Sequence, residues 1–283
     1  MSWTVLIVLS TLLFSLSNLF HRVVMRDEKS DPLAQTFIYY GFGGLLTVTM
    51  ALVRGDFQYA ISPRQLPFFV FIMIGGLLGP ICKFKAVKYL EASECSILLS
   101  SQNLWEVMLA FIVLREAFSY QRLMGTIIVL LGIAIAQWRK KQFVFNHAVI
   151  FALLSSLIYA INNIVGDYVL RDFDVFSFNA YTWLLPILLL ICIRPQIYKK
   201  LSFYRQPRHL ISVIIVACTA TLASICISRA YQVARNASQL APISASGTIF
   251  TVLFAILLLK ERNHMRQKIG GAIVVVLGLL LLI

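Results

Sequence analysis

The chain has little charge. Only 13% of its 283 residues are charged, against roughly 25% in an average soluble domain, while 59% are hydrophobic and the mean hydropathy is +0.83. This composition excludes a soluble globular enzyme. The 25 lysines and arginines outnumber the 12 acidic residues, but they stand in short stretches between apolar runs. They therefore indicate the loop charges of an integral membrane protein, with no basic domain left to bind nucleic acid.

Motifs for chemistry are also missing. The five cysteines form no CxxC pair, and the four histidines lack metal-ligand spacing. The sequence has no HExxH, no Gly-x-Ser-x-Gly and no P-loop. We therefore expect no enzyme activity, metal or cofactor. The N-terminus has no basic n-region or small-residue cleavage site, which favours an uncleaved first span over a signal peptide.

Long apolar runs fill the chain. A helix needs about 20 residues to cross the hydrocarbon core, and ten such segments fit, which predicts an all-α integral membrane protein. Their continuous apolar character argues against a strand barrel. The segments are 3–23, 33–53, 66–86, 94–114, 120–138, 147–167, 175–193, 209–229, 237–259 and 267–283. The longest connector, 194–208, reads as a plain basic loop.

The two halves of the chain repeat each other. A shift of 145 residues keeps polar residues in one register over more than 100 positions, which is hard to obtain by chance. Pairs in this register include Ser10 with Ser155, Asn18 with Asn163, Arg26 with Arg171, Asp27 with Asp172, Ser101 with Ser246 and Glu116 with Glu261. The register then slips by one residue, so that Gly125 and Gly132 match Gly271 and Gly278.

This repeat predicts the domain organisation. We expect a five-helix repeat over 1–138, a connecting loop at 139–146 and a second five-helix repeat over 147–283. Because five is odd, the second repeat must be inverted relative to the first. Inverted five-helix repeats are typical of secondary transporters, which use them to build two alternating access states.

Each half ends in a similar motif. The copies are LREAFSYQRLMG at 114–125 and LKERNHMRQKIGG at 259–271, preceded by AVKYLEAS at 86–93 and AYQVARNAS at 230–238. With these motifs the whole chain resembles the EamA-type branch of the drug/metabolite transporter superfamily. The resemblance implies a carrier of small metabolites, in which helices 1–4 and 6–9 surround a central cavity and helices 5 and 10 are peripheral. One departure is that Asn103 and Thr248 stand near positions where the family usually has proline.

Two signals disagree about the orientation of the chain in the membrane. Under the ten-helix division, 18 of the 25 positive residues lie on one side of the membrane. Positive residues accumulate on the cytoplasmic side, so the loop charges put both termini outside. The family resemblance instead implies that both termini are cytoplasmic. We favour the loop charges.

Glu106 is the sharpest candidate for a functional group. It lies near the middle of the fourth apolar segment, where an ionisable side chain costs at least ~2.5–3.5 kcal/mol and normally faces a partner or a wet cavity. Gln102 lies one turn before it on the same face, and Asn103 and Trp105 lie beside it. Glu106 is either a substrate-binding or proton-coupling carboxylate or a structural ion-pair partner.

Three cations occupy related places in the two halves. Lys83 and Lys85 lie in the third apolar segment, and Arg229 lies in the eighth. A cavity flanked by these cations would suit a solute with a carboxylate or phosphate group. The alternative is that all three extend to the membrane interface as ordinary orientation charges.

Amides form a third group of candidates. Asn18 in the first segment matches Asn163 in the sixth, where Asn162 is its neighbour. Tyr159 precedes this pair by one turn, and His21 follows Asn18 by about one turn. These side chains either bind polar groups of a substrate or hydrogen-bond neighbouring helices.

Other residues favour structural roles. Tyr39, Tyr40 and Trp183 read as belt or packing aromatics rather than cavity walls. Glycines at 75, 76 and 79 make the third segment either a hinge or a close-packing helix. Glu116 and Glu261 lie at loop edges, and we interpret them as helix-end determinants.

The sequence thus predicts a secondary active transporter that moves a small polar metabolite, such as an amino acid or sugar, by alternating access. The alternative is a flippase or accessory subunit for a lipid-linked intermediate on the same fold. We expect a multi-pass protein of the plasma (inner) membrane, with a small-molecule substrate, the lipid bilayer and a coupling proton or ion as partners.

Overall fold

The computed structural model describes residues 2–55, 57–114, 120–139, 142–143, 146–233, 241–261 and 263–282. Nearly all of these residues are helical. In chain order the elements are α1 (Trp3–Met25), α2 (Pro32–Arg54), α3 (Leu66–Tyr89), α4 (Ala92–Leu99), α5 (Ser101–Leu114), α6 (Tyr120–Gln137), β1 (Trp138–Arg139), β2 (Gln142–Phe143), α7 (His147–Leu170), α8 (Val175–Ile193), the 3-10 helix η1 (Pro195–Arg205), α9 (Pro207–Val233), α10 (Ala241–Leu258) and α11 (Met265–Leu282).

The long helices suit a bilayer. Six of them, α1, α2, α3, α7, α8 and α9, are long and apolar enough to cross a membrane, and α6 and α10 contain shorter apolar stretches. Large apolar side chains remain on the outside of the bundle, including Val53 at 84% exposure and Leu257 at 71%. A soluble protein rarely exposes extended apolar surface, so lipid is the natural surrounding. The all-helical membrane class is confirmed, and the count of ten spans stays a prediction.

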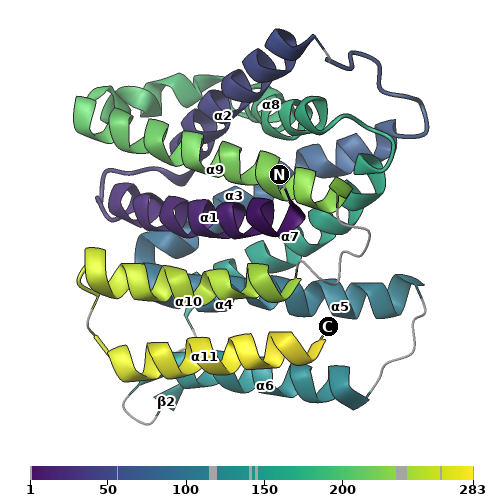
Figure 1. Cartoon of the computed structure of the whole chain (residues 1–283). Helices are drawn as coiled ribbons and strands as arrows, with labels where there is room; N and C mark the ends of the chain where they lie inside the picture. Colours follow the sequence, from purple (N-terminus) through teal and green to yellow (C-terminus); the bar gives the residue numbers. More distant parts are fainter. Residues whose placement is uncertain are drawn as a thin grey trace.

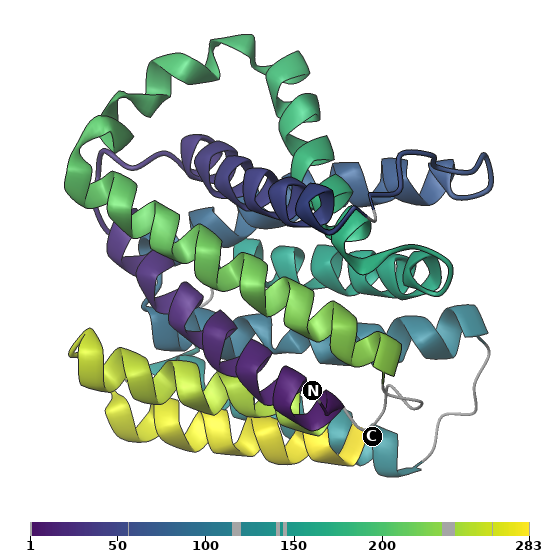
Figure 2. The ribbon, with the colours of Figure 1, turned by 45° about the horizontal axis from the view of Figure 1, so that its top comes forward.

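The helices stack in layers that mix the two halves of the chain (Figure 1). Helix α1 packs along α9, α3 along α7, α2 along α8, and α6 along α11. Since α7 is the repeat mate of α1 and α9 that of α3, exchanging the halves turns the α1–α9 pair into the α7–α3 pair. The α2–α8 and α6–α11 pairs each join two repeat mates, so the exchange leaves them unchanged. The α6–α11 pair lies at one edge of the stack in both views (Figures 1 and 2), which agrees with the peripheral position implied for the fifth and tenth helices.

The two halves run in opposite directions. The C-terminal end of α1 meets that of α3, where Arg22 donates to the carbonyls of Val87 and Lys88 at 2.5 and 2.8 Å. The C-terminal end of α7 instead lies with α9 at the other end of the stack, where Gln232 donates to the Leu170 carbonyl at 3.5 Å. We call the end that carries Arg22 and Lys88 the basic end and the other the opposite end.

One predicted helix is broken. The segment 94–114 was expected to be continuous, but it is divided into α4 and α5 at Ser100. The Ser100 hydroxyl donates to the Ile97 carbonyl at 2.5 Å and the Ser101 hydroxyl donates to the Leu98 carbonyl at 2.7 Å. Such hydroxyl bonds compete with the backbone ladder and bend helices. The sequence-based prediction missed this effect of two adjacent serines.

Two connectors also differ from expectation. The basic connector 194–208 was predicted to be a plain loop, but it contains η1, whose Ile197 and Tyr204 are buried. The connector between the halves contains the antiparallel β1–β2 pair, with Trp138 opposite Phe143. These short elements satisfy backbone groups locally, which apolar periodicity does not reveal. The expected start of the ninth segment, 237–240, lies outside the described residues.

Glycines allow α6 and α11 to approach closely. An added Cβ at Gly271 would stand 2.8 Å from the carbonyl oxygen of Gly132, and one at Gly278 would stand 2.9 Å from that of Gly125. Two helices can pack backbone to backbone only where the side chain is a hydrogen. The matched glycines of the two repeat copies therefore form one antiparallel contact.

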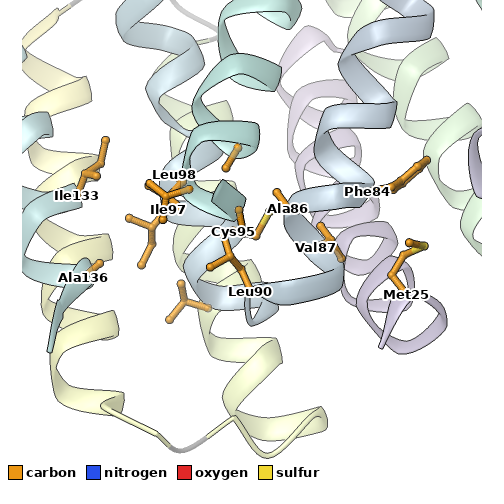
Figure 3. Packing of buried hydrophobic residues seen from close by; sticks show 14 of the residues in the cluster. Met25, Phe84, Ala86, Val87, Leu90, Cys95, Ile97, Leu98, Ile133 and Ala136 are labelled. Atoms are coloured by element: carbon orange, nitrogen blue, oxygen red, sulfur yellow. The ribbon is translucent and has the colours of Figure 1, made fainter. Parts of the chain in front are cut away.

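The largest apolar core among the described residues includes the packing at the basic end. It joins the C-terminal parts of α1 and α3 to α4 and α6 (Figure 3). Its members include fully buried side chains from both sides of the α3–α4 connection, such as Phe84, Ile97 and Leu98. This packing fixes α4 at the position where residues of the second half reach it.

Candidate functional site

Asn18 and Lys83 join α1 to α3. The Lys83 ammonium donates to Oδ1 of Asn18 at 2.8 Å. Both side chains are partly buried. Two of the predicted site residues are thus in direct contact, and a cation is held among apolar helices by an amide oxygen.

His21 lies on α1, about one turn after Asn18, and is enclosed by aromatic rings. Its ring is fully buried, with centroids 4.8 Å from Tyr39 and 4.6 Å from Phe84. Nδ1 lies within hydrogen-bonding distance of Nε2 of Gln35, at 3.4 Å. The enclosure favours a positioning role for His21 over direct contact with a solute.

Glu106 receives two amide donors. Gln102 donates to Oε1 at 3.0 Å from one turn away on α5, and Asn163 donates to the same oxygen at 2.9 Å from α7. The predicted pairing of Gln102 with Glu106 on one face is present, and Asn163 connects it to the second half. Beside them the Trp105 indole donates to the Ser156 hydroxyl at 3.1 Å.

Tyr159 and Asn162 pack against the glycines of α3. An added Cβ at Gly75 would stand 2.3 Å from Oδ1 of Asn162, and one at Gly79 would stand 3.2 Å from the Tyr159 ring. Of the two roles considered for these glycines, the contacts favour close packing. Ser155 strengthens the same interface by donating to the Gly79 carbonyl at 2.9 Å.

The other candidates have local partners. The Asn103 amide donates to the Ser100 carbonyl at 3.3 Å, and the Lys85 ammonium stands 4.7 Å from the centroid of the Phe151 ring. Arg229 is exposed near the end of α9 and donates to Gln232 at 2.9 Å. The described contacts therefore do not gather Lys83, Lys85 and Arg229 around one cavity.

Sequence reasoning missed several polar residues in the interior. Gln35 touches His21, and Asn179 lies between Ser224 and Ser228, with heavy-atom distances of 2.5 and 3.3 Å. Polar residues within apolar runs were the available signal. Their partners lie on other helices, so spacing along one helix could not identify them.

The aromatic residues fit the packing role. Tyr39 and Trp183 are at most 9% exposed. Their ring centroids lie 4.9 Å apart, and Tyr40 stands 5.0 Å from Trp183. These rings fill the interface between α2 and α8.

Glu261 caps a helix of the other half. Its carboxylate accepts from the amides of Ala92 and Ser93 at 2.9 and 3.2 Å and from the Ser93 hydroxyl at 2.9 Å. Nearby, buried Lys268 of α11 pairs with Glu91. The contacts match the helix-end role predicted for Glu261, and its repeat mate Glu116 lies outside the described residues.

An apolar exterior around two antiparallel helical halves defines an integral, multi-pass membrane protein. The sequence model of the EamA-like transporter family matches residues 1–137 and 146–283. The chain therefore belongs to the EamA-like transporter family, and the resemblance seen in the sequence is confirmed. The family consists of membrane transporters and not of enzymes, so membership implies a small-molecule substrate and a lipid environment.

Likeness to solved structures supports the fold alone. No curated protein matches the chain. One solved crystal structure, described only as that of a protein, aligns with a TM-score of 0.69 and 15% sequence identity, covering 97% of this chain and 96% of that chain. At this identity the likeness supports the fold and says nothing of a substrate.

Proposed function

We propose that the protein is a secondary active transporter of a small polar metabolite across the plasma (inner) membrane. In this proposal ten helices span the bilayer, with repeats at 1–138 and 147–283 around the connector 139–146. The repeats rock against each other to expose one site alternately to the two sides. Amino acids, sugars and related organic solutes are the substrate classes we favour.

The observation that carries this proposal is a pair of opposite charges held by repeat-related amides. Asn18 binds the Lys83 ammonium, and Asn163 binds the Glu106 carboxylate. Charges inside a membrane protein are costly and mark solute or ion pathways. Lys83 on α3 and Glu106 on α5, two helices that both pack against α7, would suit a solute that carries both polar and ionised groups.

Contacts between the halves at both ends support alternating access. At the basic end Glu261 binds the start of α4. At the opposite end the backbone N–H of Gln58 donates to the Ser177 hydroxyl at 2.9 Å, and the Tyr181 hydroxyl donates to the Tyr59 carbonyl at 3.0 Å. Opening one set of contacts while the other holds would expose the site to one side at a time.

A binding and transport experiment tests this function. Purified protein is screened by thermal shift against amino acids, sugars and organic anions, because a ligand that binds the folded state raises its stability. Hits are then assayed for uptake into proteoliposomes. We expect Lys83→Met to abolish uptake of the hit, while Lys199→Met, at an exposed position of η1, retains it.

Two results would reject the proposal. Uptake that survives Lys83→Met and Glu106→Gln together would remove the charged pair from the pathway. Movement of labelled lipid between leaflets without uptake of any solute would support the flippase alternative.

A further inference from the structure

A cavity of about 360 Å³ opens at the basic end, away from the Glu106 site. It lies where the end of α1, the start of α9 and the α10–α11 connection meet. Its wall is rich in charge. Four cations and two carboxylates line it, namely Arg22, Arg26, Arg208, Lys260, Glu91 and Glu261.

The two carboxylates are already engaged by protein groups. Glu91 pairs with buried Lys268 and accepts from Asn263 at 3.3 Å. Glu261 is bound by the amides and hydroxyl at the start of α4. Both carboxylates thus already have protein partners, and the six charged lining groups together carry an excess of two positive charges.

Arg22 is held in place at the back of the cavity. Its Nη1 donates to the carbonyls of Val87 and Lys88. A guanidinium carries five N–H donors in a fixed planar fork, so Nη2 and Nε can still serve a ligand. A positioned arginine has lost most of its side-chain freedom before binding, which favours a bidentate contact with an oxyanion.

The connection between α10 and α11 contains two residues with a left-handed backbone and contributes to the cavity wall. Lys260 has φ of 55° and His264 has φ of 52°, a left-handed backbone that residues other than glycine adopt only when their surroundings demand it. The turn lets Lys260 line the cavity while the next residue, Glu261, reaches α4. Both halves of the chain thus supply cations to one cavity.

We propose that this cavity binds a phosphate group, supplied either by the headgroup of an anionic lipid or by a free phosphate compound. Arginines from α1 and α9 would bind the phosphate oxygens bidentately, and the excess of two positive charges can neutralise either a phosphodiester monoanion or a phosphate dianion. Because Arg26 belongs to the first half and Arg208 to the second, the occupant links the halves at the basic end. The cavity shares no lining residue with the proposed transport site, but Arg22 lies one helical turn beyond Asn18 on α1. The proposal does not depend on the identity of the transport substrate.

The test compares two double variants of the full chain in zwitterionic detergent. Arg26→Gln with Arg208→Gln removes two exposed cavity cations. Lys29→Gln with Arg205→Gln removes two exposed cations from the same end outside the lining. Thermal unfolding is measured with inorganic phosphate against chloride at equal ionic strength, and with short-chain phosphatidylglycerol against phosphatidylcholine.

We expect phosphate or phosphatidylglycerol to raise the melting temperature of the wild type and of the control variant. The cavity variant should need at least tenfold more ligand for the same shift. Stabilisation by phosphatidylglycerol alone identifies a lipid headgroup, and stabilisation by phosphate identifies a soluble ligand. No stabilisation of the wild type by either ligand, or equal stabilisation of both double variants, would overturn the proposal. If the cavity variant does not fold, Lys260→Gln replaces it under the same criteria.

Discussion

Asn18 and Asn163 occupy matching positions in the two halves, yet each holds a charge of opposite sign. Asn18 accepts from the Lys83 ammonium at 2.8 Å, and Asn163 donates to the Glu106 carboxylate at 2.9 Å. An amide can do both because it carries an acceptor and a donor group. The repeat therefore conserves the amide position within the chain while the charge that it binds has changed.

The charged residues themselves have neutral repeat mates. Lys83 aligns with Ser228, which lies within hydrogen-bonding distance of Asn179, and Glu106 aligns with Thr251. The fold thus has an approximate twofold symmetry, but the candidate site does not share it. If Lys83 and Glu106 contact the solute as proposed, this difference makes them the positions at which one substrate would be distinguished from another.

Glu106→Gln tests the proton-coupling role. The substituted side chain keeps an oxygen that can accept from Asn163 and Gln102, so we expect the melting temperature to stay within a few degrees of the wild type. Uptake into proteoliposomes should lose its dependence on a pH gradient, because a glutamine cannot carry a proton through the cycle. Glu28→Gln, at an exposed position, serves as control. A lower melting temperature with unchanged pH dependence would instead assign Glu106 a structural role.

Gly271→Ala and Gly270→Ala form a matched pair. The first places a Cβ 2.8 Å from the Gly132 carbonyl, and the second meets nothing within 4 Å. We expect Gly271→Ala to separate α6 from α11 and to lower the free energy of unfolding by about 1–3 kcal/mol, as overpacking typically does. Gly270→Ala should be neutral or stabilising by up to about 1 kcal/mol, because alanine favours helix. Equal melting temperatures of the two variants would contradict the close contact.

Glu261→Ala should destabilise the protein. The substitution leaves the Ala92 and Ser93 amides without their carboxylate, and the N-cap residue Glu91 makes no side-chain cap bond of its own. Leaving donors of buried residues such as Ala92 and Ser93 without an acceptor costs about 1–3 kcal/mol. Thermal or denaturant unfolding in detergent measures the loss, with Glu28→Ala as control. An unchanged midpoint would show that water replaces the carboxylate without cost.

Asp31 gives a pH dependence outside the spans. Burial alone would raise the pKa of its carboxyl, but the hydrogen bond from Lys200 and those from the amides of Ala34 and Leu33 outweigh it, so the pKa is lowered. A lowered pKa adds stability that is present above the unfolded-state value, roughly 3.9, and lost as pH falls through the folded-state value. Asp31→Asn should remove this acid dependence and cost no more than about 1 kcal/mol at neutral pH, because the ion pair is partly exposed. Unfolding midpoints between pH 3 and 7 measure it, and Asp27→Asn is the control.

Much of the fold could be predicted because apolar length and repeat register are local or periodic signals. Spacing of four residues sufficed to put Gln102 and Glu106 on one face. The link from Glu106 to Asn163 could not be found this way, because it depends on how α5 packs against α7. The break at Ser100 was missed for a different reason, since it arises from hydroxyl bonds that a hydropathy pattern does not contain.

The grouping of cations shows where repeat reasoning misleads. Arg229 aligns with Phe84, between Lys83 and Lys85, so the repeat suggested one shared cavity. In an inverted repeat, however, matching positions lie towards opposite ends of the bundle. The contacts agree, because Arg229 bonds Gln232 near the opposite end while Lys83 bonds Asn18. Repeat mates should therefore be expected apart unless they lie close to the symmetry axis.

Orientation in the membrane gives the last prediction. The basic end carries Arg22, Lys88 and Lys268 together with η1, which is tied to the start of α2 by the ion pair of Lys200 with Asp31 at 2.6 Å. Helix α11 begins at this end, with Lys268 in its first turn, and runs away from it. Both chain ends lie on the same side of the stack (Figure 1).

Because positive residues accumulate on the cytoplasmic side, we expect the basic end to face the cytoplasm and both termini to face outwards. A reporter that is active only in the cytoplasm should be active when inserted after Lys200 and silent when fused after Ile283. Insertion after Arg64, in the α2–α3 connection at the opposite end, is the control and should also be silent. Activity after Ile283 and Arg64 with silence after Lys200 would show that the orientation implied by the family resemblance prevails over the loop charges.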